Sequence, residues 1–128
     1  RPDRLVVGEV RGPELCDLLT ALNTGHEGGC GTVHANSVGD VPARLEALAA
    51  LGGLSRSACH AQMAAALHAV VHLRRRRDGM RGVGQVGVVR VRPQGEVFIE
   101  EALAVDDRGR SAPCSGWTAL ARLTGVEP

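Results

Sequence analysis

Three side chains in the first third of the chain have the types and the order that phosphate chemistry uses. Glu9 directly follows an apolar run at residues 5–7 and Gly8. A carboxylate at the C-terminal end of a buried strand can orient a water molecule, or hold magnesium through water, beside a nucleotide phosphate. His26 and His34 flank a glycine-rich stretch, and an imidazole can donate a hydrogen bond to a phosphate oxygen. Together they predict a phosphate-facing site.

Each of these residues also has a plainer interpretation when taken alone. Glu9 can cap the helix that follows it or form an ion pair with Arg11. Either histidine can be a partly buried residue whose hydrogen bonds are satisfied inside the protein. The order of a strand-end glutamate followed by two histidines around glycines favours the phosphate site over these separate explanations.

The elements that would position Glu9 follow from the apolar pattern. Residues 5–7 suit a short strand buried on both faces of a parallel sheet. Pro13 opens a helix at its favoured first position. Leucines at positions 15, 18, 19 and 22 give that helix one apolar face, and residues 23–25 end it.

The histidines lie around the next elements. A second short strand is expected at residues 32–34, just before a break at 36–37. Asp40 is a plausible N-cap for a helix that reaches about residue 51, and Ser55 or Ser57 begins an alanine-rich helix that runs to about residue 69.

The second half of the chain changes to the period of strands. Strands are expected at residues 70–76, 83–92 and 96–99, with Asp78 and Gly79 forming a hairpin turn. A polar loop then covers 106–115, and a short helix follows around 117–123. This pattern predicts an antiparallel meander after an α/β first half.

Composition narrows the choice of function. The chain has 128 residues, enough for one domain, and a formal net charge of +1, which gives no global argument for nucleic acid or membranes. No uncharged apolar stretch approaches the roughly 20 residues that span a bilayer. All 15 basic residues are arginine, whereas a P-loop needs a lysine. The four cysteines form no C-x-x-C pair and predict reduced, buried thiols without zinc.

Two further patterns have weaker interpretations. His68 and His72 are spaced as metal ligands on a helix can be, but the helix is expected to end between them, which favours structural roles. The arginine run 74–77 can meet a phosphate or an acidic partner, or it can be a solvated hairpin end. The chain has no tyrosine and one Phe and one Trp, which argues against stacking on nucleic-acid bases.

Two segments together resemble a known family. Residues 1–12, Arg-Pro-Asp-Arg-Leu-Val-Val-Gly-Glu-Val-Arg-Gly, resemble the Walker B segment of type II/type IV secretion ATPases. Residues 23–28, Asn-Thr-Gly-His-Glu-Gly, with 31–37, Gly-Thr-Val-His-Ala-Asn-Ser, resemble their His box, in the form of the branch serving Flp/Tad pili and type IV secretion. The resemblance is strong to about residue 51 and continues more weakly to about 99.

The resemblance implies a fold and a domain organisation. The expected fold is a partial RecA-like P-loop NTPase core, α/β from the Walker B strand onward, with the antiparallel meander after it. Residues 1–105 would be the C-terminal part of the motor domain, and 106–128 a polar loop with a short helix. The family's Walker A motif and Asp box have no match in the chain. We therefore expect the chain to be a fragment that is inactive by itself.

Carried over to this sequence, the resemblance also implies roles for the site residues. Glu9 and His34 would be catalytic, with Glu9 positioning the attacking water and assisting magnesium through water rather than as a direct ligand. His26, Arg11 and Arg44 would sense the nucleotide. The backbone of the phosphate loop would include the following positions: Gly8, Thr24 and Gly25.

The cofactors implied for the intact parent are ATP and Mg²⁺. The implied partners are sister subunits in a homo-hexamer and an inner-membrane platform protein, with no nucleic acid. The implied location is cytoplasmic, against the inner membrane. Two alternatives stay open: a non-catalytic remnant that acts as an interaction module, and a DNA-translocating relative with the same core fold.

Overall fold

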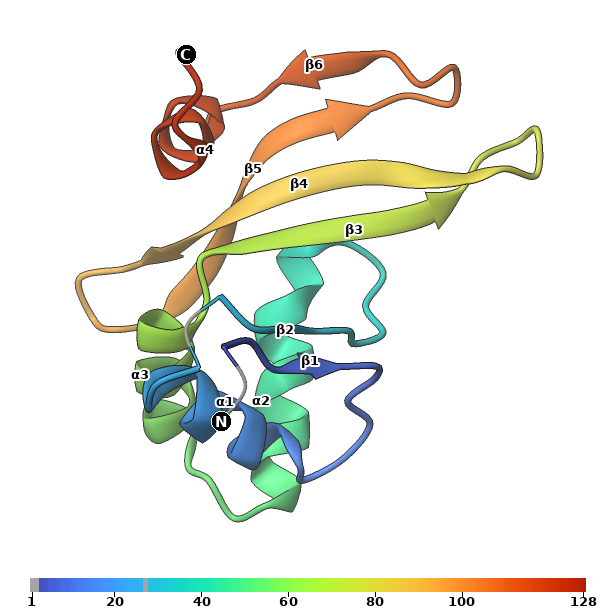
Figure 1. The fold of residues 1–128 in the computed structure, drawn as a ribbon. Coiled ribbons are helices and arrows are strands. Elements are labelled where there is room, and N and C mark those ends of the chain that lie inside the picture. Colours follow the sequence, from blue (N-terminus) through green and yellow to red (C-terminus); the bar gives the residue numbers. More distant parts are fainter. Residues whose placement is uncertain (1–2, 27) are drawn as a thin grey trace.

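The structure, a computed structural model, describes residues 3–26 and 28–128. A helical layer carries a short parallel strand pair, and a four-stranded antiparallel sheet lies over it (Figure 1). The parallel pair consists of β1 (Val6–Val7) and β2 (Cys30–Gly31). The chain is therefore mixed α/β, as predicted, with its parallel and antiparallel pairing in separate sheets.

Three helices bury their apolar faces against one another. These are α1 (Leu15–Asn23), α2 (Val41–Leu51) and α3 (Arg56–Ala66). Leucine, valine and alanine dominate the core, and full burial of one large aliphatic side chain contributes about 1.5–3 kcal/mol. The buried cluster is Val10, Leu15, Leu18, Leu19, Leu22, Val41, Leu45, Leu48, Ala49, Cys59, Met63, Ala66 and Val97.

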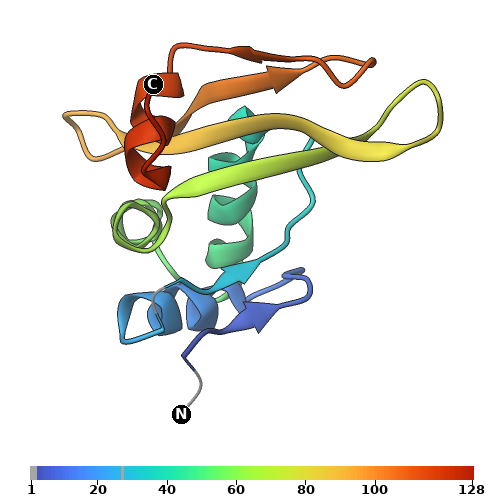
Figure 2. The ribbon, with the colours of Figure 1, turned by 45° about the horizontal axis from the view of Figure 1, so that its top comes forward.

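The second half of the chain is the predicted antiparallel meander. Its strands are neighbours in chain order: β3 (Ala69–Arg75), β4 (Arg81–Val91), β5 (Val97–Val105) and β6 (Ser111–Pro113). Gly79, Gly95 and Gly109 lie in the three turns with φ of 84°, 92° and 78°, a region that favours glycine. The view in Figure 2 shows the sheet above the helices.

A buried polar link joins the helices to the sheet. Nδ1 of His60, on α3, accepts a hydrogen bond from the Val97 N–H at 2.8 Å. The ring proton therefore sits on Nε2, which donates to Glu46 of α2 at 3.0 Å. Nε of Arg56 lies 3.0 Å from the other carboxylate oxygen. The His60 hydrogen bond, with further help from the Arg56 charge, lowers the pKa of Glu46 below its ordinary value.

The position of the second parallel strand and the capping of α2 differ from the prediction. The second parallel strand is Cys30–Gly31, earlier than the expected 32–34, because it pairs with β1 through glycine-rich backbone that carries no apolar signal. Asp40 precedes α2 as expected, but its carboxylate accepts from the Ser37 hydroxyl at 2.8 Å and caps no helix N–H.

The last strands are longer than predicted. β5 continues to Val105 instead of ending near residue 99. The expected loop at 106–115 contains a strand, because residues 111–113 pair with β5 and the Cys114 N–H donates to the Ala102 carbonyl at 2.9 Å. The predicted short helix is α4 (Trp117–Thr124), which ends at Gly125. Within residues 3–26 and 28–128, no helix is long and apolar enough to cross a membrane.

Candidate functional site

The parallel strand pair determines where the site residues lie. The Cys30 N–H donates to the Leu5 carbonyl at 2.9 Å, and the Val10 N–H donates to the Thr32 carbonyl at 2.8 Å. Between them, the Thr32 hydroxyl donates to the Gly8 carbonyl. These bonds hold residues 8–10 alongside residue 32. Because the strands are parallel, the two chain segments leave the pair at the same end, the C-terminal end of both strands.

Glu9 contacts two of the predicted site residues at this end. Its Oε2 lies 2.7 Å from a terminal nitrogen of Arg11, and its Oε1 lies 2.8 Å from Nε2 of His34. The Glu9 side chain is 28% exposed, whereas that of His34 is 82% exposed. The Arg11 side chain is 77% exposed, so a partly buried carboxylate is contacted by two side chains that both face solvent.

These contacts favour the ionised form of Glu9. The hydrogen bond from Arg11 has the largest effect and lowers the pKa of Glu9, and the charges of Arg11 and His34 lower it further. The same hydrogen bond raises the pKa of Arg11. The carboxylate is an acceptor that can orient a water molecule or an imidazole, and it is not set up to donate a proton. The ion pair with Arg11, one of the plainer interpretations of Glu9, is present as well.

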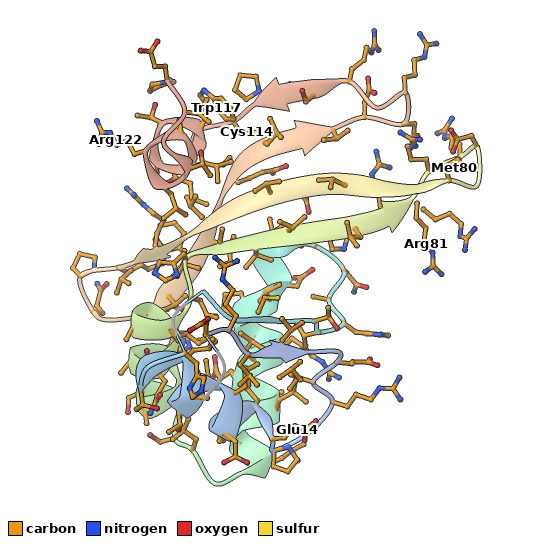
Figure 3. All side chains as sticks on the ribbon, viewed as in Figure 1. Glu14, Met80, Arg81, Cys114, Trp117 and Arg122 are labelled. Carbon is orange, nitrogen blue, oxygen red and sulfur yellow. The ribbon has the colours of Figure 1, made fainter. Side chains whose placement is uncertain are left out.

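Glu9 does not cap α1, because its two carboxylate oxygens contact Arg11 and His34; Glu14 instead holds the turn before this helix. Oε1 of Glu14 accepts from the Arg11 N–H at 2.9 Å and from the Gly12 N–H at 3.1 Å. These backbone bonds lower the pKa of Glu14. Glu14 lies immediately before α1 (labelled in Figure 3) and fixes the turn that carries Arg11. We did not predict it, because no spacing signal distinguishes it from a solvated glutamate.

A second unpredicted contact holds the segment around His34. Nε2 of His72, on β3, lies 3.1 Å from the Ala35 carbonyl and donates to it. Farther along, the Val38 N–H donates to the Gln85 side chain at 3.2 Å. The residue after His34 is thus tied to the antiparallel sheet. His72 has a structural role here, as the sequence favoured.

His26, Thr24 and Gly25 lie at the other end of β2. His26 precedes that strand, its N–H donates to the Ala21 carbonyl at 3.3 Å, and its carbonyl accepts from the Gly29 N–H. The Thr24 hydroxyl donates to the Thr20 carbonyl at 2.7 Å, as part of the end of α1. Because the strand lies between the two histidines, the structure brings His34, but not His26, to Glu9.

Gly8 and Arg44 add no side-chain contact to Glu9 within the described residues. Gly8 is exposed, and a Cβ built there would meet no atom within 4 Å. Arg44 is exposed on α2, and within the described parts of the chain its side chain makes no ion pair or hydrogen bond. Nδ1 of His26 is buried without a hydrogen-bond partner among the same residues. Glu27, which belongs to the His-box resemblance, lies outside the described residues.

Comparison with known proteins identifies a matching family and related proteins. The model of the type II/IV secretion system protein family matches residues 1–113. A Mycobacterium tuberculosis (strain H37Rv) protein named "Putative conjugal transfer protein" is 63% identical over 90 residues, covering 70% of this chain and 26% of that protein. Conjugal transfer protein TrbB of Rhizobium radiobacter is 52% identical over 50 residues, covering 39% of this chain and 16% of that protein.

The chain thus spans only 26% and 16% of the length of these two curated relatives. The family match, in contrast, extends over most of the chain and includes both segments that resemble Walker B and the His box. The chain therefore belongs to the type II/IV secretion system protein family.

Proposed function

We propose that this chain is the catalytic-glutamate part of a motor that hydrolyses ATP to drive a secretion machine. Flp/Tad pilus assembly and protein export are the processes that the resemblance favours. The observation that carries the proposal is the contact of Glu9 with both Arg11 and His34 at one edge of the parallel strand pair. Ligands of open parallel sheets bind outside the carboxyl ends of the strands, which is where this cluster lies.

The residues present fit one side of a site for ATP and Mg²⁺. Glu9 has a lowered pKa and is held by two donors, so it offers an oriented anionic oxygen to water or to a hydrated magnesium ion. ATP with magnesium would supply the phosphoryl group and balance its charge. The lysine-containing P-loop that cradles phosphates is not among the 128 residues, which contain no lysine. We therefore propose that the chain alone does not turn over ATP.

In the proposed reaction, Glu9 orients the water that attacks in line. Positioning and electrostatics supply most of the catalysis in such transfers, so the direction of the carboxylate matters more than its basicity. Arg11 fixes one oxygen and His34 the other. The His34 ring is mostly exposed, so it is open to a ligand and would exchange Glu9 for a phosphate oxygen. Such an exchange would report the nucleotide state to the segment that His72 ties to β3.

The remaining site residues are proposed to act from other positions. His26 and Arg44 would sense nucleotide at a contact with a neighbouring subunit, since neither touches the Glu9 cluster. Gly8, Thr24 and Gly25 would contribute backbone to phosphate binding in the intact protein. The motor core would be a partial RecA-like fold, assembled as a homo-hexamer on the cytoplasmic face of the inner membrane beside a platform protein.

The substitution Glu9→Gln tests the proposal, because glutamine keeps the shape of the side chain and removes its charge. In the full-length parent, Glu9→Gln should abolish ATP turnover while nucleotide binding survives. His68→Gln is the matched control, because His68 is exposed and distant in sequence from the cluster. Wild-type turnover by Glu9→Gln would remove Glu9 from the mechanism.

Specific observations favour two alternative functions. Both oxygens of Glu9 are occupied by protein side chains, as expected for a non-catalytic interaction module. The conjugal names of the relatives favour a motor that serves DNA transfer. An in-frame P-loop upstream in the gene would exclude the module, and DNA-stimulated ATP turnover by the parent would favour the DNA-moving relative.

A further inference from the structure

The turns at one end of the antiparallel sheet contain seven of the 15 arginines of the protein. Residues 74–81 and 106–110, which we call the arginine tip, contain seven arginines and three aspartates, a formal net charge of +4. The whole chain carries +1, so the remainder is net negative. The sequence run 74–77 showed only part of this cluster, because the other arginines come from a different hairpin.

Ion pairs hold the two turns side by side. Asp107 lies 2.8 Å from a nitrogen of Arg74 and 3.3 Å from Nε of Arg77. Arg74 also donates to the Val105 carbonyl at 2.8 Å. Asp107 therefore joins the two hairpins, whereas Asp78 pairs with Arg76 and Asp106 with Arg110 inside their own turns.

Several arginines of the tip are exposed to solvent. Arg77 is 93% exposed, even though it reaches Asp107. Arg81 and Arg108 are exposed, and neither side chain makes an ion pair or hydrogen bond within residues 3–26 and 28–128. Guanidinium groups bind phosphate and carboxylate oxygens in a bidentate manner, so these groups are suited to an anionic surface.

One apolar side chain lies within the charged cluster. Met80, 60% exposed, is next to Arg81 at the end of the β3–β4 hairpin (Figure 3). A single exposed methionine is ordinary elsewhere on a protein surface. Here, the phosphates of a nucleic acid would offer it no apolar environment, whereas the boundary between headgroups and acyl chains of a bilayer offers both anions and an apolar layer.

We propose that the arginine tip docks on an anionic bilayer surface, with the outer arginines on lipid phosphates and carboxylates and Met80 inserted at the headgroup boundary. The contact is independent of the nucleotide site, because no residue of the tip touches Glu9, Arg11 or His34. In an oligomer, each subunit would present one tip, and several weak contacts would add to a stable attachment.

Sedimentation with lipid vesicles tests the proposal on the chain as it stands. The chain should bind vesicles that contain phosphatidylserine more strongly than vesicles of phosphatidylcholine alone, and salt should weaken that binding. Each arginine near an anionic surface contributes about fivefold in partitioning. Arg81→Gln with Arg108→Gln should therefore reduce binding by roughly 25-fold, and Met80→Ser should reduce it at unchanged charge, whereas Met80→Leu should retain it.

Arg122→Gln is the matched control, because Arg122 is an exposed arginine of α4 at the opposite end of the sheet (Figure 3). It should bind vesicles like the unaltered chain, and circular dichroism should show the same fold for all variants. Equal losses in Arg122→Gln and the tip variants would overturn the proposal. So would the absence of vesicle binding, or binding of duplex DNA that depends on Arg81 and Arg108 while vesicles are ignored.

Discussion

Nε2 of His34 lies 2.8 Å from Oε1 of Glu9, across the edge of a parallel strand pair. The Thr32 hydroxyl and the Val10 N–H cross-link the same two segments immediately before this contact. Glu9 and His34 are therefore positioned by backbone pairing, and their contact does not depend on loop conformation alone. A glutamate that follows one strand thus contacts a histidine that follows the other.

Arg11 should control the ionisation of Glu9. Its hydrogen bond is the largest cause of the lowered pKa of Glu9, so Arg11→Gln should raise that pKa toward its ordinary value. A carboxylate with a lowered folded pKa stabilises the fold above its unfolded pKa and loses that contribution as the pH falls through the folded value. NMR titration of the Glu9 carboxyl carbon measures the pKa directly. An unchanged titration curve in Arg11→Gln would show that the ion pair does not persist in solution.

Glu14 should stabilise the start of α1 in a pH-dependent way. Its carboxylate accepts two backbone hydrogen bonds, which lower its pKa. Glu14→Gln should therefore lower the melting temperature at neutral pH, and the difference from wild type should shrink as the pH falls through the folded pKa of Glu14. Glu127→Gln is the control, since Glu127 is exposed near the end of the chain. A pH-independent difference would point to lost packing instead.

The site shows what sequence patterns can and cannot predict. The contact of Glu9 with His34 was predictable because it depends on the order of residues along two paired strands. His26 was predicted in the same cluster, but the direction of β2 places it at the other end of the strand. Glu14 and His72 contact backbone groups, and such contacts leave no signal in residue spacing.

His60 should contribute more to stability than any other histidine that the structure describes. The residue is 4% exposed, and its ring bridges the Val97 N–H and the Glu46 carboxylate. His60→Ala leaves both groups without that partner, which should lower the free energy of unfolding by about 1–3 kcal/mol. Urea unfolding measures the loss, and the exposed His68→Ala should stay within about 0.5 kcal/mol of wild type. Similar losses in the two variants would contradict the bridging role.

Gly87 should tolerate no side chain, because a Cβ there would lie 2.3 Å from Cγ2 of Ile99 and 3.4 Å from the Glu100 carbonyl oxygen. Gly87→Ala is expected to destabilise the fold by about 1–3 kcal/mol, since β4 and β5 must separate to make room. Gly39→Ala is the control: the nearest atom to its Cβ is Oγ of Ser37 at 3.7 Å. Equal thermal stability of the two variants would show that this contact relaxes at no cost.

The fold was predictable where apolar periodicity is strong. It was less predictable where backbone pairing determines whether a segment is a strand. The leucines of α1 and the Asp78–Gly79 turn led to the correct elements. β6 was missed because three residues ending in Pro113 carry little strand signal, and its pairing with β5 creates the strand. β2 was misplaced for the related reason that Gly31 has no side chain to mark it.

The most direct test of the account is a double-mutant cycle of ATP turnover in the full-length parent with Glu9→Gln and His34→Asn. If the two residues act as one unit, each single variant should lose nearly as much turnover as the double variant, while nucleotide binding is retained. Additive losses would show that Glu9 and His34 act separately. Near-normal turnover in the double variant would contradict the assignment of this cluster as the catalytic site.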